Sequence, residues 1–288
     1  MTACESASTP FVQTESYVVH HEPVSSRYFL LRLRCPEVAK RSQPGQFVML
    51  ACTPDLGGSS GEPLLPRPLA ILDARGDEIE LLYFVAGKGT ALLKHSVQSA
   101  LASGRSAAPL RIIGPLGRGF EPIPDVDIHV GVGGGSGVAP LVYFLRRYGT
   151  QQPDRWHLIL AARSAEQLAR RDVVGVPGTL HQATDDGSVG FKGNGVQALE
   201  QLLNGEFKGK RVGIYAAGPE PMMEAAAKLG RARKLPVRVS LEARMACGVG
   251  VCRACVVDGT SPHKKTGLKR RTVCQDGPVF DIDELAGW

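Results

Sequence analysis

Short apolar runs separated by turn-forming residues mark the first third of the chain. They are rich in β-branched and aromatic residues and fall at 17–19, 28–31, 46–50, 69–72, 79–84 and 110–113. Closely spaced short strands of this kind are typical of a β-sandwich or β-barrel. Residues 90–98 have helical character, and the proline- and glycine-rich stretch 54–66 is expected to be an exposed loop.

The pattern changes from residue 126 onward, where apolar strands alternate with helical segments. The predicted strands are 126–130, 156–161, 179–183, 211–217 and 237–241. The predicted helices between them are 141–148, 197–203 and 221–229. Strands that alternate with helices in this way predict a parallel, doubly wound α/β sheet.

Length and composition indicate the number of domains and the cellular compartment of the protein. The 288 residues are enough for about two domains at roughly 150 residues each, with a short segment to spare. No apolar run approaches the ~18–20 residues of a membrane span, and the N-terminus has no export signal. Cys4, Cys35 and Cys52 stand alone and are expected to be free thiols in a reducing compartment. We therefore expect a cytoplasmic protein with no membrane partner.

The net charge of +6 is largely local. Five basic residues crowd residues 263–271, namely Lys264, Lys265, Lys269, Arg270 and Arg271. No nucleic-acid motif or aromatic-studded basic surface accompanies them, so we expect no nucleic-acid partner. The loop is either a solvated surface or one that docks a protein partner and offsets the charge of a thiolate cluster.

Four of the seven cysteines lie near the C-terminal end, at Cys247, Cys252, Cys255 and Cys274. Their spacing, C-x4-C-x2-C-x18-C, is the plant-type arrangement for a [2Fe–2S] cluster. Gly248 and Gly250 fall where the backbone must pass close to the cluster and can take positive φ. A zinc site is the alternative, although zinc ligands usually come as two C-x2-C pairs and only one is present here.

Two stretches of the β-rich half could bind an anion. Arg67-Pro68-Leu69-Ala70 places a guanidinium at the start of a strand, where it could grip a phosphate. Gly87-Lys88-Gly89-Thr90 is a glycine turn that opens a helix and aims free N–H groups at an anion. Each is also compatible with an ordinary surface arginine or helix start. Together they could hold the two ends of a dinucleotide pyrophosphate.

Glycines also follow two strands of the second half. The strand at 126–130 leads into a glycine-rich loop and then a helix, a phosphate-cradling unit. The expected ligand-binding residues of this loop are Gly133, Gly134, Gly135, Ser136, Gly137 and Pro140. Gly218 and Pro219 stand at the carboxyl end of a later strand, where such sheets bind ligands, although the turn also suits plain helix initiation.

The chain has a β-rich domain, then a nucleotide-binding α/β domain and then a cysteine cluster. In this order it resembles the ferredoxin reductase superfamily, and within it the electron-transfer subunit of the two-subunit, NAD-dependent dihydroorotate dehydrogenases. The resemblance covers roughly residues 12–285. It rests on the motifs above and on the segments 114–120 (Gly-Pro-Leu-Gly-Arg-Gly-Phe), 184–190 (Thr-Asp-Asp-Gly-Ser-Val-Gly) and 273–280 (Val-Cys-Gln-Asp-Gly-Pro-Val-Phe). The C-terminal cluster and the Cys-x-Asp-Gly-Pro-Val-Phe ending are the most specific marks.

The resemblance implies three domains after a flexible N-terminus (1–11). These are an FAD-binding antiparallel β-barrel (12–122), an NAD-binding α/β domain (123–242) and a [2Fe–2S] domain (243–288). It adds Leu82, Tyr83 and Phe84 to the expected FAD contacts.

The implied function is electron transfer between NAD and an FMN-containing dihydroorotate-oxidising subunit, through FAD and the cluster, in pyrimidine synthesis. Two copies of each subunit would form a heterotetramer. Because the substrate chemistry belongs to the partner, no catalytic residue is expected in this chain. The alternatives are a related reductase subunit that serves ferredoxin, a hydrogenase or another oxidoreductase, a self-sufficient reductase, and a zinc-stabilised nucleotide-binding docking module.

Three positions depart from the family pattern. Ala70 replaces a serine that faces the flavin, Ala217 replaces a cysteine common near the nicotinamide, and Arg253 stands where glycine is frequent. A charge at Arg253 is expected to raise the potential of the cluster. Arg163 follows the strand at 156–161 with no acidic residue for a ribose hydroxyl, which leaves NADP as an alternative to NAD.

Overall fold

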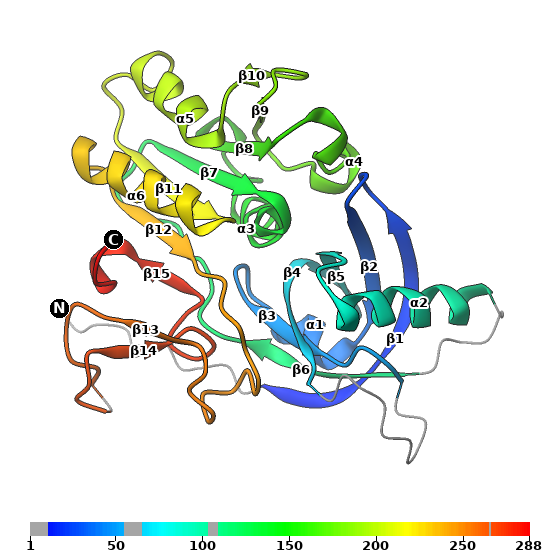
Figure 1. Cartoon of the computed structure of the whole chain (residues 1–288). Coiled ribbons are helices and arrows are strands. Elements are labelled where there is room, and N and C mark those ends of the chain that lie inside the picture. The colour runs from blue at the N-terminus through cyan, green and yellow to red at the C-terminus, as the bar shows by residue number, and fades with distance from the viewer. Residues whose placement is uncertain (1–10, 55–64, 103–108, 265) are drawn as a thin grey trace.

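Figure 1 shows the computed structural model, which describes residues 11–54, 65–102, 109–264 and 266–288. Cys4, Lys265, most of the expected loop 54–66 and all but Phe11 of the N-terminus expected to be flexible lie outside the described residues. No helix in these four ranges is both long and apolar enough to cross a membrane.

The first six strands close into an antiparallel barrel, which confirms the predicted barrel fold. The strands are β1 (Val12–Pro23), β2 (Tyr28–Arg34), β3 (Phe47–Leu50), β4 (Arg67–Arg75), β5 (Glu78–Phe84) and β6 (Leu110–Leu116). They pair in the order β1-β2-β5-β4-β3-β6. Inward-facing apolar side chains such as Leu31, Val48 and Ile71 are fully buried in its core. Helices α1 (Pro36–Arg41) and α2 (Lys88–Ala102) lie in the connections.

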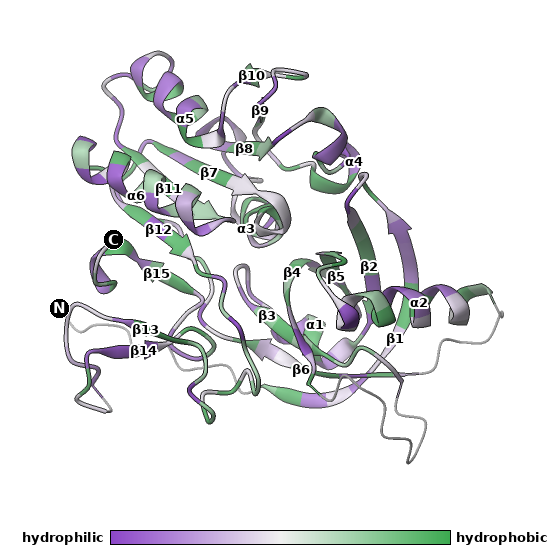
Figure 2. Cartoon of the chain, viewed as in Figure 1, coloured by the Kyte–Doolittle hydropathy of each residue, from purple (hydrophilic) through white to green (hydrophobic). Residues whose placement is uncertain are grey.

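The second half forms a seven-stranded sheet in the order β10-β9-β8-β7-β11-β12-β15. Its parallel strands are β7 (Ile128–Gly134), β8 (Trp156–Ala162), β9 (Thr179–Thr184), β10 (Phe191–Lys192), β11 (Val212–Ala217) and β12 (Val237–Ser240). Its helices are α3 (Val138–Tyr148), α4 (Arg171–Val174), α5 (Gly195–Asn204) and α6 (Glu220–Arg233). Figure 2 shows hydrophobic residues along the buried strand β8.

Helices cover both faces of this sheet, as a doubly wound fold requires. Val130 and Ile214 pack with α5 and α6 on one face. Leu158 and Tyr215 pack with α3 on the other face. Residues of the barrel strands β2, β4 and β5 belong to this second core, so α3 lies between the sheet and the barrel.

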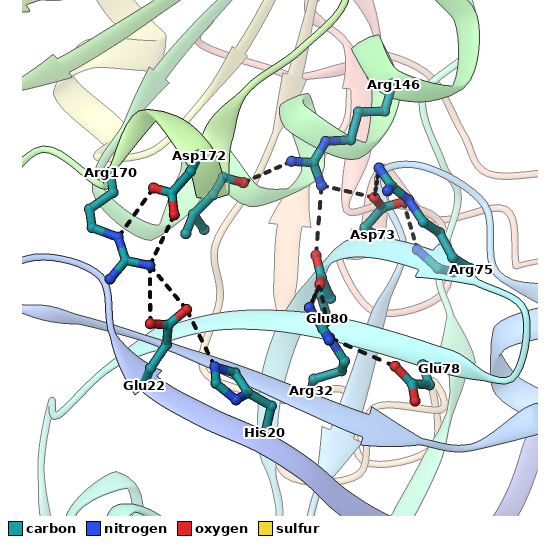
Figure 3. Close-up of polar contacts among 12 residues, drawn as sticks. His20, Glu22, Arg32, Asp73, Arg75, Glu78, Glu80, Arg146, Arg170 and Asp172 are labelled. Atoms are coloured by element: carbon teal, nitrogen blue, oxygen red, sulfur yellow. Dashed lines mark hydrogen bonds and ion pairs between the residues drawn. The ribbon is translucent and has the colours of Figure 1, made fainter.

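Ion pairs also join the barrel to the sheet (Figure 3). Arg146 on α3 contacts Asp73 on β4 at 2.8 Å and Glu80 on β5 at 3.7 Å. Arg170 contacts Glu22 at the end of β1 at 3.0 Å. The two halves are therefore held together by both apolar packing and charge.

The C-terminal segment contains β13 (Val256–Asp258) and β14 (Arg270–Thr272), which form a small hairpin-like sheet. The chain then returns to the large sheet, where β15 (Val279–Asp281) pairs antiparallel with β12. The sequence did not predict this edge strand. A further difference is that β7 continues through Gly134, whereas the sequence predicted a strand ending at residue 130. A Cβ on Gly131 would lie 3.1 Å from Leu158 Cδ1, so glycine permits close packing there.

Candidate cofactor sites and metal centre

Arg67 and Gly89 lie in direct contact, although they belong to different elements. Arg67 begins β4 and Gly89 lies in the first turn of α2. A Cβ on Gly89 would lie 2.5 Å from Arg67 Nη2, so the guanidinium packs against the glycine and would have to move if a side chain were added there. Arg67 Nη1 also donates to the carbonyl oxygen of Leu65 at 2.7 Å. A fixed guanidinium thus lies against the start of a helix, an arrangement that suits an anionic group.

Thr90 holds the turn that precedes this helix. Its hydroxyl accepts the backbone N–H of Ala86 at 2.9 Å and donates to the carbonyl oxygen of Gly87 at 3.2 Å. The side chain is buried. Thr90 therefore orders the glycine turn beside Arg67.

The expected flavin contacts on β4 and β5 divide between the two faces of the barrel wall. Leu69 and Tyr83 belong to the barrel core, and Tyr83 hydrogen-bonds His21 at 2.8 Å. Ala70, Leu82 and Phe84 belong to the core between barrel and sheet. Pro68 and Ala70 are half-buried. The alternation follows from the two-residue period of a strand.

Arg27 and Tyr28, which the sequence did not single out, cover Phe84. The Arg27 guanidinium carbon lies 4.7 Å from the centre of the Phe84 ring, and the Tyr28 ring packs edge-on against that ring at 5.9 Å. Burial raises the pKa of Tyr28. Nearby protein atoms that displace water raise the pKa of the Glu242 carboxyl, although the residue as a whole is exposed. No local sequence pattern distinguishes these residues.

The predicted glycine segments after β7 and β11 meet backbone to backbone. Gly135–Gly137 form a short 3-10 turn, and Pro140 is buried in the first turn of α3. A Cβ on Gly137 would lie 2.4 Å from the backbone nitrogen of Gly218. Gly135 has φ +62°, and a Cβ there would lie 2.9 Å from the hydroxyl of Tyr28. The glycines thus bring β7, β11 and the barrel close together.

Ser136 is half-buried in that turn, and Pro219 precedes α6 directly. Ala217 is buried at the end of β11. Arg163 is exposed just after β8. These positions lie at the carboxyl ends of neighbouring parallel strands, where doubly wound sheets bind ligands.

The four C-terminal cysteines are free of disulfides. Cys255 and Cys274 are buried, Cys247 is half-buried and Cys252 is exposed. Backbone N–H groups point at their sulfurs: Val249 and Cys252 donate to Cys247 Sγ at 3.4 Å, and Gly250 donates to Cys274 Sγ at 3.2 Å. N–H donors of this kind stabilise thiolates and tune cluster potentials.

The thiol pKa values differ between the loop and the closing segment. Burial acts to raise the pKa of Cys247, but the N–H groups of Cys252 and Val249 outweigh it and lower the pKa to about 7. Burial and the neighbouring Cys255 raise the pKa of Cys274 to about 12. Within the described ranges, no three His, Cys, Asp or Glu side chains converge on one ion position. A [2Fe–2S] cluster needs two thiolates at each iron, and the all-thiol donor set fits that group.

Left-handed backbone conformations shape the loop as the sequence predicts. Gly248 has φ +73° and Gly250 has φ +82°. Arg253 also has a positive φ, +52°, a backbone conformation that glycine adopts more readily than arginine. Asp276 stabilises the segment that carries Cys274, because its carboxylate accepts hydrogen bonds from the backbone N–H and the hydroxyl of Thr272.

Comparison with solved structures defines the class of protein. One structure, described as an NADH-dependent reduced ferredoxin-NADP oxidoreductase studied for flavin-based electron bifurcation, matches with TM-score 0.73 and 25% identity over 94% of this chain and 89% of that one. The flavohem-like FAD/NAD binding domain of nitric oxide dioxygenase from Vibrio cholerae matches in fold, with TM-score 0.61 and 16% identity over 78% of this chain and 96% of that one. The chain is therefore an oxidoreductase component of ferredoxin reductase-like fold with a cluster-binding segment.

Sequence relatives narrow this class. The family model for the iron-sulfur cluster binding domain of dihydroorotate dehydrogenase B matches residues 242–286. The electron transfer subunit of dihydroorotate dehydrogenase B (NAD(+)) from Bacillus caldolyticus is 36% identical over 91% of this chain and 94% of that protein. The electron transfer subunit from Clostridium acetobutylicum is 35% identical over 84% of this chain and 86% of that protein. The chain belongs to the family of electron transfer subunits of dihydroorotate dehydrogenase B.

Proposed function

We propose that this chain carries electrons between a separate dihydroorotate-oxidising subunit and NAD, using FAD and a [2Fe–2S] cluster. The observation that carries the proposal is the four-cysteine loop, with N–H donors aimed at its sulfurs. The same chain holds the Arg67–Gly89 contact and the glycine loops that meet at Gly137 and Gly218. The family relationship supplies the pathway, since the relatives are electron transfer subunits of an NAD-linked dihydroorotate dehydrogenase.

Each group of residues has a distinct proposed task. Arg67 and the α2 start at Gly89 bind the FAD pyrophosphate, and Pro68 and Ala70 lie beside its ring system. The glycines 133–137 with Gly218 and Pro219 bind the nicotinamide dinucleotide. Cys247, Cys252, Cys255 and Cys274 hold the irons. When bound, FAD takes up an electron pair as hydride and the cluster carries electrons singly, which converts a two-electron reaction into one-electron steps.

The finer proposal is a complex with an FMN-containing catalytic subunit, two copies of each. The exposed edge of the cluster loop supports a docking role, because Cys252 is exposed and Val251 beside it is 80% exposed. Exposed Lys264 and Arg270 lie on the adjoining segment. Exposed cationic side chains on a segment close in sequence to an exposed apolar residue fit an acidic partner surface.

The experiment is to co-express the chain with the FMN-containing subunit and to measure dihydroorotate-dependent reduction of NAD. We expect activity in the complex and in neither subunit alone. Cys252→Ser should remove or destabilise the cluster while FAD stays bound and NADH still reduces a dye at the flavin. Loss of dye reduction along with the cluster would show that the proposed electron order is wrong.

The docking surface has its own test. Reversal of charge at Lys264 and Arg270 should weaken subunit association in a salt-dependent way. The matched control reverses Lys208 and Lys210, which are exposed just before β11 and carry the same charge. If the Lys264/Arg270 variant and the Lys208/Lys210 variant associate equally well with the partner, the basic loop is only a solvated surface.

A second candidate acceptor follows from the 25% identical structure, which is described as a reduced ferredoxin-NADP oxidoreductase. A chain that binds FAD and iron but never couples to the FMN subunit would favour such an acceptor. Comparison of kcat/KM for NADH and NADPH, in the native chain and in Arg163→Ala, decides the nicotinamide cofactor. We expect NADH to be preferred in both.

A further inference from the structure

The cluster loop rests directly on a barrel strand, at a contact between Met49 and Gly248. Gly248 follows the ligand Cys247, and Met49 lies on β3. A Cβ on Gly248 would lie 2.4 Å from Met49 Cγ and 2.9 Å from Met49 Sδ, with Leu116 Cδ1 at 3.2 Å. The loop backbone therefore touches the methionine side chain with no space for another group.

Met49 is also the cross-strand neighbour of the proposed flavin strand. In the antiparallel β3–β4 pair, Met49 lies opposite Pro68, and Phe47 lies opposite Ala70. Side chains opposite each other on paired strands project to the same face, about 5 Å apart. Met49 and Pro68 therefore stand side by side on the wall that faces the cluster loop.

The surroundings of Met49 exclude water. Met49 is fully buried, and Leu116 is 4% exposed. Both belong to one continuous apolar core with the cluster ligands Cys255 and Cys274. The thioether is polarisable and adapts its shape to irregular gaps, which suits a contact between a strand and a loop.

We propose that Met49 is the positioning residue that sets the distance between the flavin-binding strand and the cluster loop. The inference rests on the proposed function, because it takes FAD on β4 and iron on the four cysteines. Met49 forms and breaks no bond. Each electron that the cluster gains in the NADH-driven direction is one that the reduced flavin loses. The role of Met49 is to hold Gly248, and with it Cys247, at a fixed separation from Pro68.

The test compares Met49→Ala with Met49→Leu in the FAD- and iron-loaded chain, by stopped-flow absorbance under anaerobic mixing with NADH. Flavin bleaching should keep its rate in both variants. Cluster reduction should slow several-fold in Met49→Ala, because the rate of electron transfer falls with each added ångström between donor and acceptor, and should stay near the native rate in Met49→Leu. Deuterium exchange at the amides of Val249 and Cys252 should quicken in Met49→Ala without any turnover.

The matched control is Met223→Ala, the same truncation on α6 in the same apolar core. It should lower the melting temperature as Met49→Ala does and leave cluster reduction unchanged. An unchanged rate of cluster reduction in a Met49→Ala chain with full FAD and iron overturns the inference and leaves the proposed function intact. A native chain that binds neither cofactor overturns the proposed function instead.

If Met49→Ala loses its iron, Met49→Val, a smaller truncation suited to a strand, replaces it in the same assay. Slow cluster reduction in Met49→Val supports the inference. Loss of iron from both variants overturns it, because Met49 would then be needed for cluster assembly and not for coupling.

Discussion

Arg118 and Glu284 form a two-pronged ion pair across 166 positions of sequence. Arg118 Nη1 donates to Glu284 Oε1 at 3.0 Å, Nη2 contacts Oε2, and Nε donates to the carbonyl oxygen of Val279 at 2.7 Å. The arginine lies in the connection between barrel and sheet, and the glutamate follows β15. The pair therefore fixes the C-terminal segment, and the cluster loop before it, to the junction of the two larger units.

This pair predicts a loss of stability in acid. Burial acts to raise the pKa of Glu284, but the hydrogen bond and charge of Arg118 prevail and hold it below the usual 4.5. A carboxyl whose pKa is lower in the folded state stabilises the fold above about pH 4.5 and loses this contribution as the pH falls through the folded-state pKa. Because the side chain is about one-third exposed, we expect the contribution to be about 1 kcal/mol.

Urea unfolding between pH 3 and pH 7 checks this. In Glu284→Gln, the free energy of unfolding should fall less toward low pH than in the native chain. In Asp283→Asn, where the replaced residue is 83% exposed, it should fall as much as in the native chain. Identical profiles for the native chain and Glu284→Gln would contradict the prediction.

Arg67→Ala should weaken FAD binding about ten- to a hundredfold, because a charge-assisted bond to phosphate contributes about 1.5–3 kcal/mol. The measurement is titration of the apo chain with FAD, followed by flavin fluorescence. Arg75→Ala is the control, since Arg75 lies at the other end of β4, 71% exposed beside Asp73. A similar loss of affinity in both variants would argue against a phosphate contact at Arg67.

Gly137→Ala should weaken NADH binding by a similar factor, because its Cβ would force the β7 and β11 loops apart at Gly218. Isothermal titration with NADH gives the affinity. Gly213→Ala serves as the control, because a Cβ on this β11 glycine would meet its nearest neighbours at an ordinary 3.4 Å. Native affinity in Gly137→Ala would place the dinucleotide elsewhere.

Arg146→Ala should lower the free energy of unfolding by about 2–4 kcal/mol, because it leaves the carboxylate of Asp73, 6% exposed, without its better-buried partner (Figure 3). Arg146 also donates to the carbonyl oxygens of Val173 and Gly175. Arg170→Ala removes the neighbouring ion pair with Glu22 and should cost clearly less, because that pair is exposed. Urea unfolding compares the two, and equal losses would show that burial does not decide the strength of these contacts.

Local patterns were enough to predict the doubly wound sheet and the loops at the ends of β7 and β11. They predicted a sandwich or a barrel for the first half, and the family resemblance favoured the barrel. Strand and helix periods are read over a few residues, and the glycine turns carry their own signal. The motifs that contain Arg67 and Gly89 were predicted to hold the two ends of one dinucleotide, but their direct contact was not predicted. The confirmed family and its [2Fe–2S] cluster rest mainly on the cysteine spacing and the C-terminal motif, and the FAD and NAD expectations rest on the arginine and glycine motifs.

Long-range contacts could not be predicted in the same way. Nothing near Met49 indicates that Gly248 rests on it, and the motif that contains Arg118 gives no sign of its pairing with Glu284. The three residues of β15 are too few to show a strand period, and their pairing with β12 depends on the path of the cluster segment between them. Glu242 and Tyr28 acquire their raised pKa values from neighbours that only folding brings close.

The position of β15 also bears on the order in which the protein folds. During synthesis β12 emerges before the cluster segment, but its antiparallel neighbour emerges after it. The backbone groups of Val239 that pair with Phe280 stay open through that interval, and an open strand edge is a template for adding strands from other chains. Sheet completion is therefore a late, non-local event that waits until the ribosome has translated the whole cysteine-bearing segment.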